Sequence, residues 1–563
     1  MTQATISDAV RPAKRWRLRP DPASVPEGDW PPLIGRLLAL RGVETASAAR
    51  AFFEAAAPVP ALPDLEKAVE RLARACRDGE VVAVFGDYDV DGITSTALLY
   101  ENLAAMGAKV LPYLPHRDSE GYGLNNAAVD SLHALGATLL VTADCGTSSI
   151  DEVATARNHG MDVIILDHHT VPPLLPAALA IVNPKRDPNS TAEPSAGGIC
   201  YYVLRALREA MDFPEDNGAM LELVALSTVC DLAPMVEGNR ALVRDGLRAI
   251  AKTERPGLRA LLEVARIDPA GVDTEAIGFA LGPRINAAGR MAHARLAFDL
   301  LVSTDETEAR EIAAELDRLN RERQQATQDA LALAGELIAD EADAPLLMVG
   351  HEELPAGIVG LVASKLVETY YKPSFVYQRG EHESVASARS IREFDVTGAL
   401  RSCPELFVRF GGHRMAAGFT AKNEKIPEIK ERLIAHAAEL LAGQDLTPAL
   451  EIDAELPLKE LRGEEIRWLS RLAPHGVENP VPTFLSRGVL VRGLRAVGKD
   501  GDHLKLQLKD GAVSWPAIAF RQQGGGIAEG TLIDLVWTLT SDSYIKGGLE
   551  LNVLDLRPAS SSG

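Results

Sequence analysis

Three aspartates at alternate positions, Asp87, Asp89 and Asp91, follow directly on the apolar run 81–85. The run predicts a strand buried on both faces, as in a parallel sheet, and an apolar, helix-like segment begins at Ile93. Like charges this close repel one another, so each carboxylate resists ionising unless a cation compensates it. The alternative is a solvated acidic turn, but the buried strand ties this turn to a core. The cluster therefore predicts a cation site where a strand ends and a helix begins.

Further acids and imidazoles follow other apolar runs, namely Asp144, His168, His169 and Asp231. If the strands before them are parallel, all of these side chains lie at one edge of the sheet. A set rich in carboxylates, with imidazole and without cysteine, suits Mn²⁺ or Mg²⁺ better than structural Zn²⁺. Two such ions held about 4 Å apart by a shared carboxylate form an arrangement that hydrolyses phosphoesters. For the Asp-His-His triplet taken alone, the alternative is a buried structural element whose polar groups are hydrogen-bonded within the core.

Alternating helices and strands must position these residues. The patterns predict helices at 65–77, 125–135 and 148–159, and strands at 81–85, 109–114, 138–142 and 163–166. A repeated strand-helix-strand order implies a parallel, doubly wound sheet. We therefore expect an α/β fold in which the acids and imidazoles all follow separate strands. In this interpretation the apolar run 221–229 is a further strand, with Asp231 at its end.

The sequence pattern of the chain changes after residue 303. Residues 303–306 (Ser-Thr-Asp-Glu) resemble a helix capping box. The segment 308–340 has no proline and a very polar middle, which predicts a long, partly solvated connecting helix. A coiled-coil partner helix is the less favoured alternative, because no heptad seam persists.

A second α/β region begins with an expected strand at 346–349. Ser387 and Arg389 lie there among small residues, a composition that suits phosphate binding. Two glycines before His413 let a backbone approach a ligand closely, although a tight turn is the structural alternative.

The last region, 448–558, is rich in short strands. They are expected at 485–497, 503–509, 513–520, 532–539 and 549–556. Five strands suggest a small barrel such as an OB-fold. A single nucleic-acid strand would then be followed by charge and stacking, through Lys505, Lys509, Trp515, Phe520 and Arg521. A packing module with Trp515 in its core is the alternative.

Composition limits the function classes. At 563 residues the chain should hold about three or four domains. The net charge of −21 argues against a protein whose whole surface is coated by nucleic acid, but it allows a local basic groove. The sequence has no apolar run of membrane-spanning length. Its five cysteines are widely spaced and predict a reducing, cytoplasmic location.

The first 55 residues contain a basic cluster at 11–19, which includes Trp16, and an apolar helical pattern at 33–53. Arginine and tryptophan together can contact nucleic acid. We favour the alternative, an N-terminal arm packed on the core.

The residues match a known set of ordered motifs. Asp-Tyr-Asp-Val-Asp-Gly at 87–92, Asp144 before Cys-Gly, and Asp-His-His at 167–169 resemble the DHH phosphoesterase superfamily. The segments 281–290 and 411–418 narrow the resemblance to the bacterial RecJ family of single-strand-specific exonucleases. The resemblance covers roughly residues 60 to 560. It implies metal-dependent removal of mononucleotides from single-stranded DNA in repair and recombination, and the direction, 5′ to 3′, rests on it alone.

The resemblance also assigns roles to residues. Asp89 and Asp144 would hold one ion, and Asp144 would bridge to a second ion held by Asp91, His168 and Asp231. Asp87 would be a ligand or a partner of one. Asp144, Asp167 and His169 form the expected catalytic group, with His169 orienting the scissile phosphate.

Substrate contacts are implied at seven positions. Arg117, Ser387 and Arg389 would grip a terminal 5′ phosphate, and the path of the strand would be lined by Arg284, Asn286, Arg290 and His413. The expected domains are an N-terminal arm (1–60), a DHH catalytic domain (61–302), a connecting helix (303–343), a DHHA1-type domain (344–446) and an OB-fold (447–563). Expected partners are single-stranded DNA, a helicase and a single-stranded-DNA-binding protein. We expect a monomer that does not engage a membrane.

Two rival functions remain. A small-molecule phosphoesterase of the DHH superfamily predicts a closed pocket and has no need of a barrel. A metal-free replication scaffold has little reason to keep mutually repelling acids such as Asp89, Asp91 and Asp144.

Overall fold

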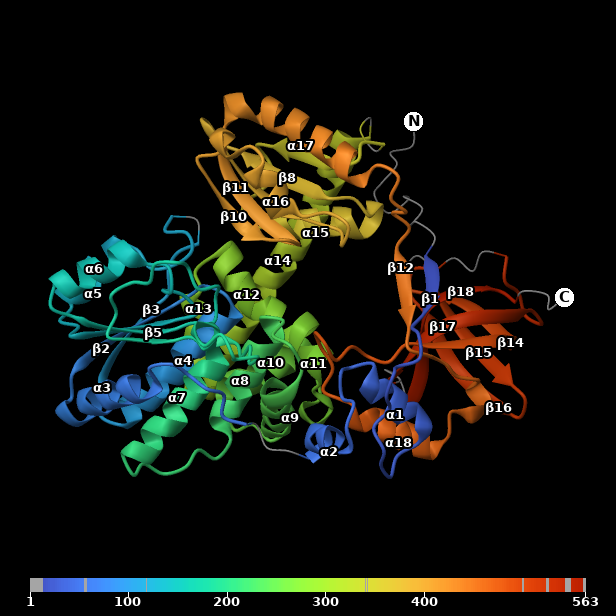
Figure 1. The fold of residues 1–563 in the computed structure, drawn as a ribbon, viewed down its shortest axis with the longest axis horizontal. Helices are drawn as coiled ribbons and strands as arrows, with labels where there is room; N and C mark the ends of the chain where they lie inside the picture. Colours follow the sequence, from blue (N-terminus) through green and yellow to red (C-terminus); the bar gives the residue numbers. More distant parts are fainter. Residues whose placement is uncertain are drawn as a thin grey trace. The chain divides into compact units, whose positions relative to one another are not determined.

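The computed structural model describes residues 14–54, 58–117, 119–339, 341, 343–498, 501–522, 526–541 and 548–559 (Figure 1). The described chain forms two compact units. Unit 1 contains Val59–Ala233 and Ala241–Thr447, and unit 2 contains Ala13–Pro58, Pro234–Arg240 and Pro448–Gly563.

Unit 1 contains the predicted parallel sheet. Its strands are β2 (Val81–Gly86), β3 (Lys109–Tyr113), β4 (Leu139–Ala143), β5 (Asp162–Leu166) and β6 (Ala180–Val182). The order is β3-β2-β4-β5-β6 and every pair is parallel, which confirms the doubly wound α/β prediction. Since the chain turns outward to opposite sides from β2 and β4, the switch point of the sheet lies between them.

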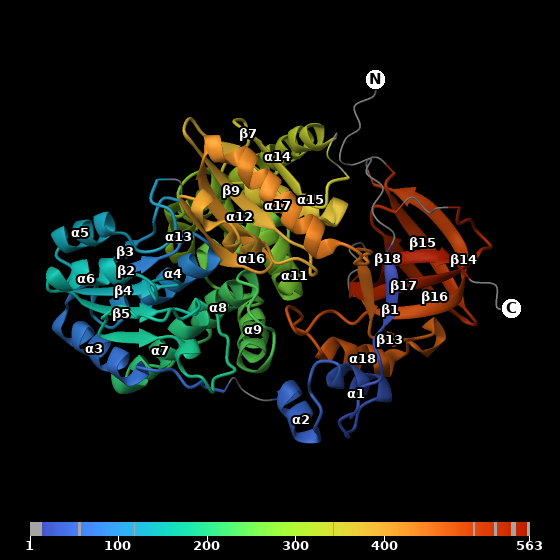
Figure 2. The same cartoon turned by 45° about the horizontal axis from the view of Figure 1, so that its top comes forward.

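Helices cover both faces of this sheet. They are α3 (Leu65–Asp78), α4 (Val90–Ala105), α5 (Asn126–Ala134), α6 (Ile150–Asn158) and α7 (Ala196–Ala210). Figures 1 and 2 show α5 and α6 on one side and α3 and α7 on the other. All five residues of β4 are buried as a result, which explains the continuous apolar run. Ser149 precedes α6, and its side chain makes no capping hydrogen bond.

A helical region follows the sheet. Its elements are α8 (Ala219–Cys230), α9 (Glu237–Ile250), α10 (Pro256–Ala265), α11 (Thr274–Ala276), the π-helical η4 (Ile277–Leu281), α12 (Gly282–Met291) and α13 (Arg295–Val302). The prediction of a strand at 221–229 is therefore wrong. That segment lies in α8, which packs against α4 and α7. A helix buried all round is apolar all round, so periodicity alone does not separate it from a buried strand.

The long connecting helix is confirmed as α14 (Glu306–Ile338). Its cap is Asp305, whose carboxylate accepts from the backbone nitrogens of Thr307 and Glu308 at 2.8 and 2.9 Å. Ser303, the residue that the capping-box pattern favoured, instead donates its hydroxyl to the Glu308 carboxylate at 2.6 Å.

Unit 1 ends in a second sheet. Its order is β10 (Arg409–His413), β11 (Ala416–Lys422), β9 (Glu383–Arg389), β8 (Ser374–Arg379) and β7 (Leu347–His351). The helices of this region are α15 (Val359–Tyr370), α16 (Val396–Arg401) and α17 (Ile426–Leu441). One core lies among β8, β9, α16 and α17, and a second joins α14, β7 and α15.

Unit 2 contains a closed five-stranded barrel. Its strands are β14 (Phe484–Val497), β15 (His503–Asp510), β16 (Val513–Ala519), β17 (Leu532–Ser541) and β18 (Leu549–Pro558). Pairing of β14 with β17 closes the barrel, as an OB-fold requires. Trp515 packs partly buried against the barrel core, and Lys505 is paired with Glu550. These two residues therefore favour the packing alternative, whereas Phe520 is 55% exposed.

The N-terminal residues are part of the same unit. Strand β1 (Arg15–Leu18) pairs in parallel with β12 (Ala449–Ile452), and the Trp16 indole donates to Asp555 at 2.6 Å. The packed-arm interpretation is thus confirmed for the described part of the basic cluster; residues 11–13 lie outside the described chain. The predicted helix at 33–53 is two helices, α1 (Pro32–Ala39) and α2 (Ala46–Glu54), separated by Gly42 at φ +76°. A left-handed residue cannot continue a right-handed helix.

The remaining elements of unit 2 are β13 (Ala454–Glu455) and α18 (Gly463–Arg471). No described helix combines the length and apolarity that crossing a bilayer demands.

Candidate metal centre and nucleic-acid site

The turn from β2 into α4 presents the three alternate aspartates. Asp89 is the N-cap of α4, and its carboxylate accepts from the backbone nitrogens of Asp91 and Gly92 at 3.0 and 3.2 Å. A Cβ at Gly92 would lie 2.4 Å from the backbone of Asp87, so only glycine permits this tight turn. The turn therefore fixes Asp87, Asp89 and Asp91 at the carboxyl end of the sheet.

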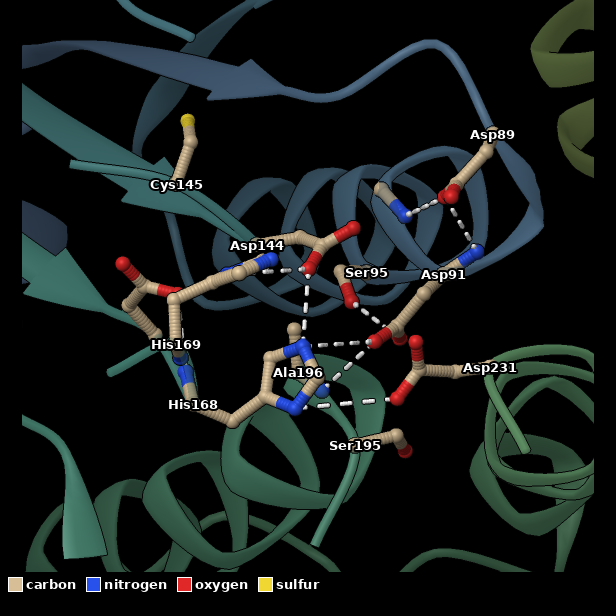
Figure 3. Close-up of polar contacts among 12 residues, drawn as sticks. Asp89, Asp91, Ser95, Asp144, Cys145, His168, His169, Ser195, Ala196 and Asp231 are labelled. Atoms are coloured by element: carbon tan, nitrogen blue, oxygen red, sulfur yellow. Dashed lines mark hydrogen bonds and ion pairs between the residues drawn. The ribbon is translucent and has the colours of Figure 1, made fainter. Parts of the chain in front are cut away.

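Asp91 is clamped by the start of α7. Its carboxylate accepts from the backbone nitrogens of Ala196 and Gly197 at 2.8 and 2.9 Å and from the Ser227 hydroxyl at 2.5 Å. Donors at a helix N-terminus favour a negative charge. These donors hold the Asp91 side chain in one orientation toward the other acids (Figure 3).

His168 joins the acids of separate elements. Its Nε2 lies 3.1 Å from Asp144, which follows β4, and 3.9 Å from Asp91. Its Nδ1 lies 3.6 Å from Asp231, the residue that directly follows α8. Figure 3 shows these side chains pointing toward one another. The predicted convergence of the groups is thus present, although Asp231 reaches it from a helix.

The side chains form overlapping groups with metal-ligand spacing. In each group the ligand atoms lie within 4.8 Å of one another, and the groups are Asp87–Asp89–Asp144, Asp91–His168–Asp231 and Asp144–His168–His169. Asp144 belongs to the first and the third of these groups. It also contacts His168, which belongs to the second and the third. Hard oxygen ligands with one or two imidazoles fit Mn²⁺ or Mg²⁺.

The electrostatics of the cluster call for cations. Burial and the charges of Asp91, Asp89, Asp87 and Asp231 raise the pKa of Asp144 well above its ordinary value. Burial and the charges of Asp91 and Asp89 raise the pKa of Asp231 to about 9. Asp87 has a buried carboxylate oxygen that lacks a hydrogen-bond partner among the described residues. Buried, unpaired carboxylates of this kind are stable as anions only with a positive charge beside them.

The two histidines differ in protonation. Burial lowers the pKa of His168, which favours the neutral ring that ligates a metal. Burial opposes protonation of His169, but a hydrogen bond to Asp167 and its charge raise the pKa of His169 overall. The His169 Nδ1 lies 2.7 Å from Asp167 Oδ1. His169 is therefore disposed to be a cation at this edge of the sheet.

Asp167 positions the histidine pair. Its carboxylate accepts from the backbone nitrogens of His168, His169 and Thr147 at 2.8, 3.1 and 3.0 Å. Burial alone would raise the pKa of Asp167, but the hydrogen bonds from His169 and Thr147 lower it below its ordinary value. Asp167 belongs to none of the ligand groups among the described residues; it contacts the ring of His169, which belongs to one of them.

Arginines gather beside the acids. Arg117 lies over the Tyr88 ring at 5.1 Å, and the Arg389 guanidinium donates to the Ser387 hydroxyl at 3.1 Å. Burial and the nearby charge of Arg117 lower the pKa of Arg389. Burial, Arg117 and Arg323 lower the pKa of Arg290 to about 10. Mutually repelling guanidinium groups favour a bound anion such as phosphate.

Other predicted substrate residues have different surroundings. The Arg284 guanidinium contacts Asp317 at 2.9 Å and donates to the Ala280 carbonyl at 2.8 Å, so it ties α12 to α14. The Thr397 hydroxyl donates to the carbonyl of His413, whose side chain is exposed. Among the described residues no hydrogen bond or ion pair links Arg284, Asn286 or His413 to the acidic cluster.

Two residues of the site were missed in the sequence. Arg323 lies in the polar middle of α14, where it resembles an ordinary solvated charge, yet its Nε is buried without a hydrogen-bond partner among the described residues. Tyr122 lies in the loop after β3, and its hydroxyl is 3.3 Å from the Asp144 carbonyl and 3.2 Å from His169 Nε2. The flanking Gly121 and Gly123 were the available signal for Tyr122.

Comparison with known proteins identifies the family. Residues 81–228 match the DHH family, N-terminal domain; residues 343–439 match the DHHA1 domain; and residues 452–554 match the RecJ OB domain. The single-stranded-DNA-specific exonuclease RecJ of Salmonella typhimurium is 37% identical over 85% of this chain and 87% of its own length. The chain belongs to the RecJ family. The Bacillus subtilis RecJ is 34% identical over 91% of this chain, which spans 66% of that protein.

Solved RecJ structures agree with this assignment. The structure of RecJ in complex with Mn²⁺ from Thermus thermophilus superposes with a TM-score of 0.83 and 30% identity, over 97% of this chain and 80% of that one. The Mg²⁺ complex from the same organism gives a TM-score of 0.77 at 29% identity, over 97% of this chain and 79% of that one.

Proposed function

We propose that the chain is a metal-dependent exonuclease that removes mononucleotides from single-stranded DNA in the 5′ to 3′ direction, in repair and recombination. The observation that carries the proposal is the set of three ligand groups that Asp144 and His168 link, with a cluster of guanidinium groups beside them. A polymer substrate is supported by the names of the RecJ relatives and by the RecJ OB domain match.

Two Mn²⁺ or Mg²⁺ ions are the cofactors that fit this donor set. Asp89 and Asp144, with Asp87 beside them, would hold one ion. Asp91, His168 and Asp231 would hold the other, and Asp144, 3.1 Å from His168, would be the ligand shared between the two ions. When bound, the ions supply Lewis acidity to the attacking water and to the phosphoryl oxygens. The Asp91 clamp from α7 orients one ligand before metal binds, which reduces the reorganisation needed.

His169 and the arginines act on the substrate directly. His169, held by Asp167 and favoured as a cation, would donate to an oxygen of the scissile phosphate and offset developing charge. Arg117, Arg389 and Ser387 would grip the terminal 5′ phosphate, while Arg290 adds positive charge. A phosphate fixed at one end of the cleavage site selects the 5′ end and sets the direction. Arg284, Asn286 and His413 are proposed to line the path of the following nucleotides.

Digestion of end-labelled single-stranded DNA tests the proposal. We expect early release of labelled mononucleotide from the 5′ label in Mn²⁺, and none in chelator or with Asp144→Ala. The exposed Asp151→Ala is the matched control and should digest like the wild type. Hydrolysis of pyrophosphate or a dinucleotide instead would support a small-molecule phosphoesterase. Binding of DNA without hydrolysis would support a scaffold.

The proposal also covers the protein partners, oligomeric state and location of the enzyme. A helicase and a single-stranded-DNA-binding protein stay predicted partners, and a monomeric, cytoplasmic protein stays the prediction for its state and location. Size-exclusion chromatography with light scattering measures the oligomeric state directly, and a dimer mass would contradict the predicted monomer.

A further inference from the structure

The chain enters unit 2 directly after the acid Asp231. The segment Pro234–Arg240 is a short internal stretch, whereas the rest of unit 2 comes from the beginning and the end of the chain. Residues 232–234 alone separate Asp231 from Met235. This link spans at most about 14 Å when fully extended. A fixed position for Met235 therefore restricts where the backbone of Asp231 can lie.

Met235 is held in unit 2 by its backbone and by its side chain. Its backbone nitrogen donates to the Val477 carbonyl at 2.7 Å. A Cβ at Gly476 would lie 3.1 Å from the Met235 side chain, so this side chain packs directly against the backbone of that loop. Met235 is buried as a result, and the start of the segment is fixed.

Arg240 fixes the other end of the segment. Its guanidinium donates to the carbonyl of Phe52, and to the carbonyls of Arg471 and Ala473 at 2.9 and 2.7 Å. It also lies over the Phe52 ring, 3.9 Å from the ring centroid, and Arg240 is buried. These carbonyls belong to parts of unit 2 that are distant in the sequence. Since buried acceptors are costly to leave without donors, the Arg240 side chain is a firm anchor.

Leu232 connects Asp231 to this anchor in an unfavourable backbone conformation. Its φ is +59°, in the left-handed region that a bulky residue rarely adopts. Such a conformation persists only where the surrounding structure enforces it. Leu232 is 70% exposed, so its own side chain contributes little packing. Helix α8 holds the chain on one side, through the Asp231 nitrogen and the Ser227 carbonyl at 2.9 Å, and the anchored Met235 holds the other.

The two acids that flank His168 differ in how they are held. Asp91 has its own donors, the backbone nitrogens of α7 and the Ser227 hydroxyl. Among the described residues the Asp231 side chain has no comparable donor; it points toward His168, whose Nδ1 lies 3.6 Å away (Figure 3). The position of the Asp231 carboxylate therefore depends on the position of its backbone.

We propose that unit 2 positions Asp231 through the anchored segment Pro234–Arg240, and that this sets the affinity of the metal centre for one of its two ions. The inference rests on the proposed function, in which Asp91, His168 and Asp231 hold that ion. Met235 and Arg240 are positioning residues, since they act on the centre through the backbone of Asp231. The barrel unit is then part of what builds the metal centre.

Insertion of two glycines after Ala233 tests the link without altering the anchor. Mn²⁺ binding to the full-length protein is measured from the EPR signal of free Mn²⁺ and by titration calorimetry. We expect the wild type to bind two ions and the insertion to weaken one of them about 10- to 100-fold, the usual effect of losing support for a ligand. The same insertion after Thr447, where the chain also passes from unit 1 to unit 2, is the matched control and should bind like the wild type.

The substitution Asp231→Asn identifies which ion is affected. It should weaken the same ion as the insertion after Ala233. Combining the two changes should weaken binding no further than Asp231→Asn does, because a support has no effect on affinity once its ligand is removed. Losses that add in the combined variant, or equal weakening of both ions, overturn the positioning role.

Arg240→Met tests the anchor itself and replaces the insertion if that variant does not fold. It retains a long side chain but removes the donors, so it should weaken the same ion. The exposed Arg248→Met, on the same helix, should bind like the wild type. Thermal melts in chelator establish that each variant is folded before it is titrated. Folded variants that bind both ions normally overturn the positioning role and leave the exonuclease in place; if the wild type binds no Mn²⁺, the proposed function fails first and this role fails with it.

Discussion

At the scale of one residue, the proposed metal ligand Asp144 is expected to lower stability when no metal is bound. Burial raises the pKa of its carboxyl group, and the charges of four neighbouring carboxylates raise it further. Without metal, Asp144→Asn should raise the midpoint of thermal unfolding near neutral pH, because it removes an acid that is ionised in the unfolded chain but whose ionisation the folded site opposes. Each kcal/mol gained corresponds to about 2–4 °C for a domain of this size. Differential scanning calorimetry in chelator measures the shift.

The same calorimetry in Mn²⁺ supplies the control. The wild type and Asp151→Asn should gain stability on adding metal, by about 2.7 kcal/mol at a hundred times the dissociation constant. Asp144→Asn should gain much less. A variant that is less stable than the wild type in chelator would show that Asp144 is not under charge repulsion.

The side chain of Asp167 is expected to affect the reaction through its hydrogen bond to the His169 ring. Asp167→Asn removes the anion that lies 2.7 Å from His169 Nδ1 and weakens the positive charge on that ring. Loss of such an orienting partner should lower kcat about 10- to 100-fold with little change in KM. The double variant with His169→Ala should be no slower than His169→Ala by itself, because residues that act as one unit are not additive. Additive losses would contradict the positioning role.

At the scale of the element, α12 must lie close against the turn that carries the acids. A Cβ at Gly289 would lie 2.7 Å from the Tyr88 carbonyl oxygen. Gly289→Ala should therefore push α12 away from the β2–α4 turn, lower stability by about 1–3 kcal/mol and raise KM through displacement of Arg290. Thermal melts and steady-state kinetics measure both effects. Gly271→Ala, with no atom within 4 Å of its added Cβ, is the matched control; equal behaviour of the two variants would contradict the prediction.

The elements of the fold differ in how well the sequence predicts them. The strands before Asp89, Asp144 and His168 were predictable because parallel strands are continuous apolar runs bounded by turn residues. The segment before Asp231 was misassigned because a helix buried on all sides gives the same run. Tyr122 and Arg323 were missed for another reason: a loop tyrosine and a helix arginine acquire their role only from neighbours distant in the chain, which periodicity does not encode.

At the scale of the whole molecule, the N-terminal strand pairs with a strand near the C-terminal barrel. Strand β1 pairs with β12, which begins after unit 1 has been completed, and Trp16 contacts Asp555. The described residues of the N-terminal arm therefore fold with the barrel, and their basic and aromatic side chains are engaged within unit 2. The net charge of the molecule is −21, so DNA binding requires a local concentration of basic side chains. The arginines near the acids in unit 1 are the cluster that the structure identifies.

A localised cluster predicts a shallow salt dependence of DNA binding. For single strands the slope of log K against log salt is about −0.7 for each neutralised phosphate, so a few contacts give a small slope. Arg389→Gln in an Asp144→Asn background should weaken binding of a 5′-phosphorylated oligonucleotide and reduce the magnitude of the slope by about 0.7. Fluorescence anisotropy over a salt series measures both quantities in the absence of hydrolysis.

The 5′ phosphate and a second arginine make this measurement specific. Arg318→Gln, on the solvent face of α14 and paired with Glu315, should change neither affinity nor slope. With a 5′-hydroxyl oligonucleotide, Arg389→Gln should not weaken binding further. The terminal phosphate that Arg389 is proposed to contact is then missing, so the protein with Arg389 intact lacks that contact too. If Arg389→Gln weakens the two oligonucleotides equally, Arg389 contacts an internal phosphate, and the terminal phosphate must select the 5′ end through Arg117 or Arg290. The direction of digestion would then have to be explained without Arg389.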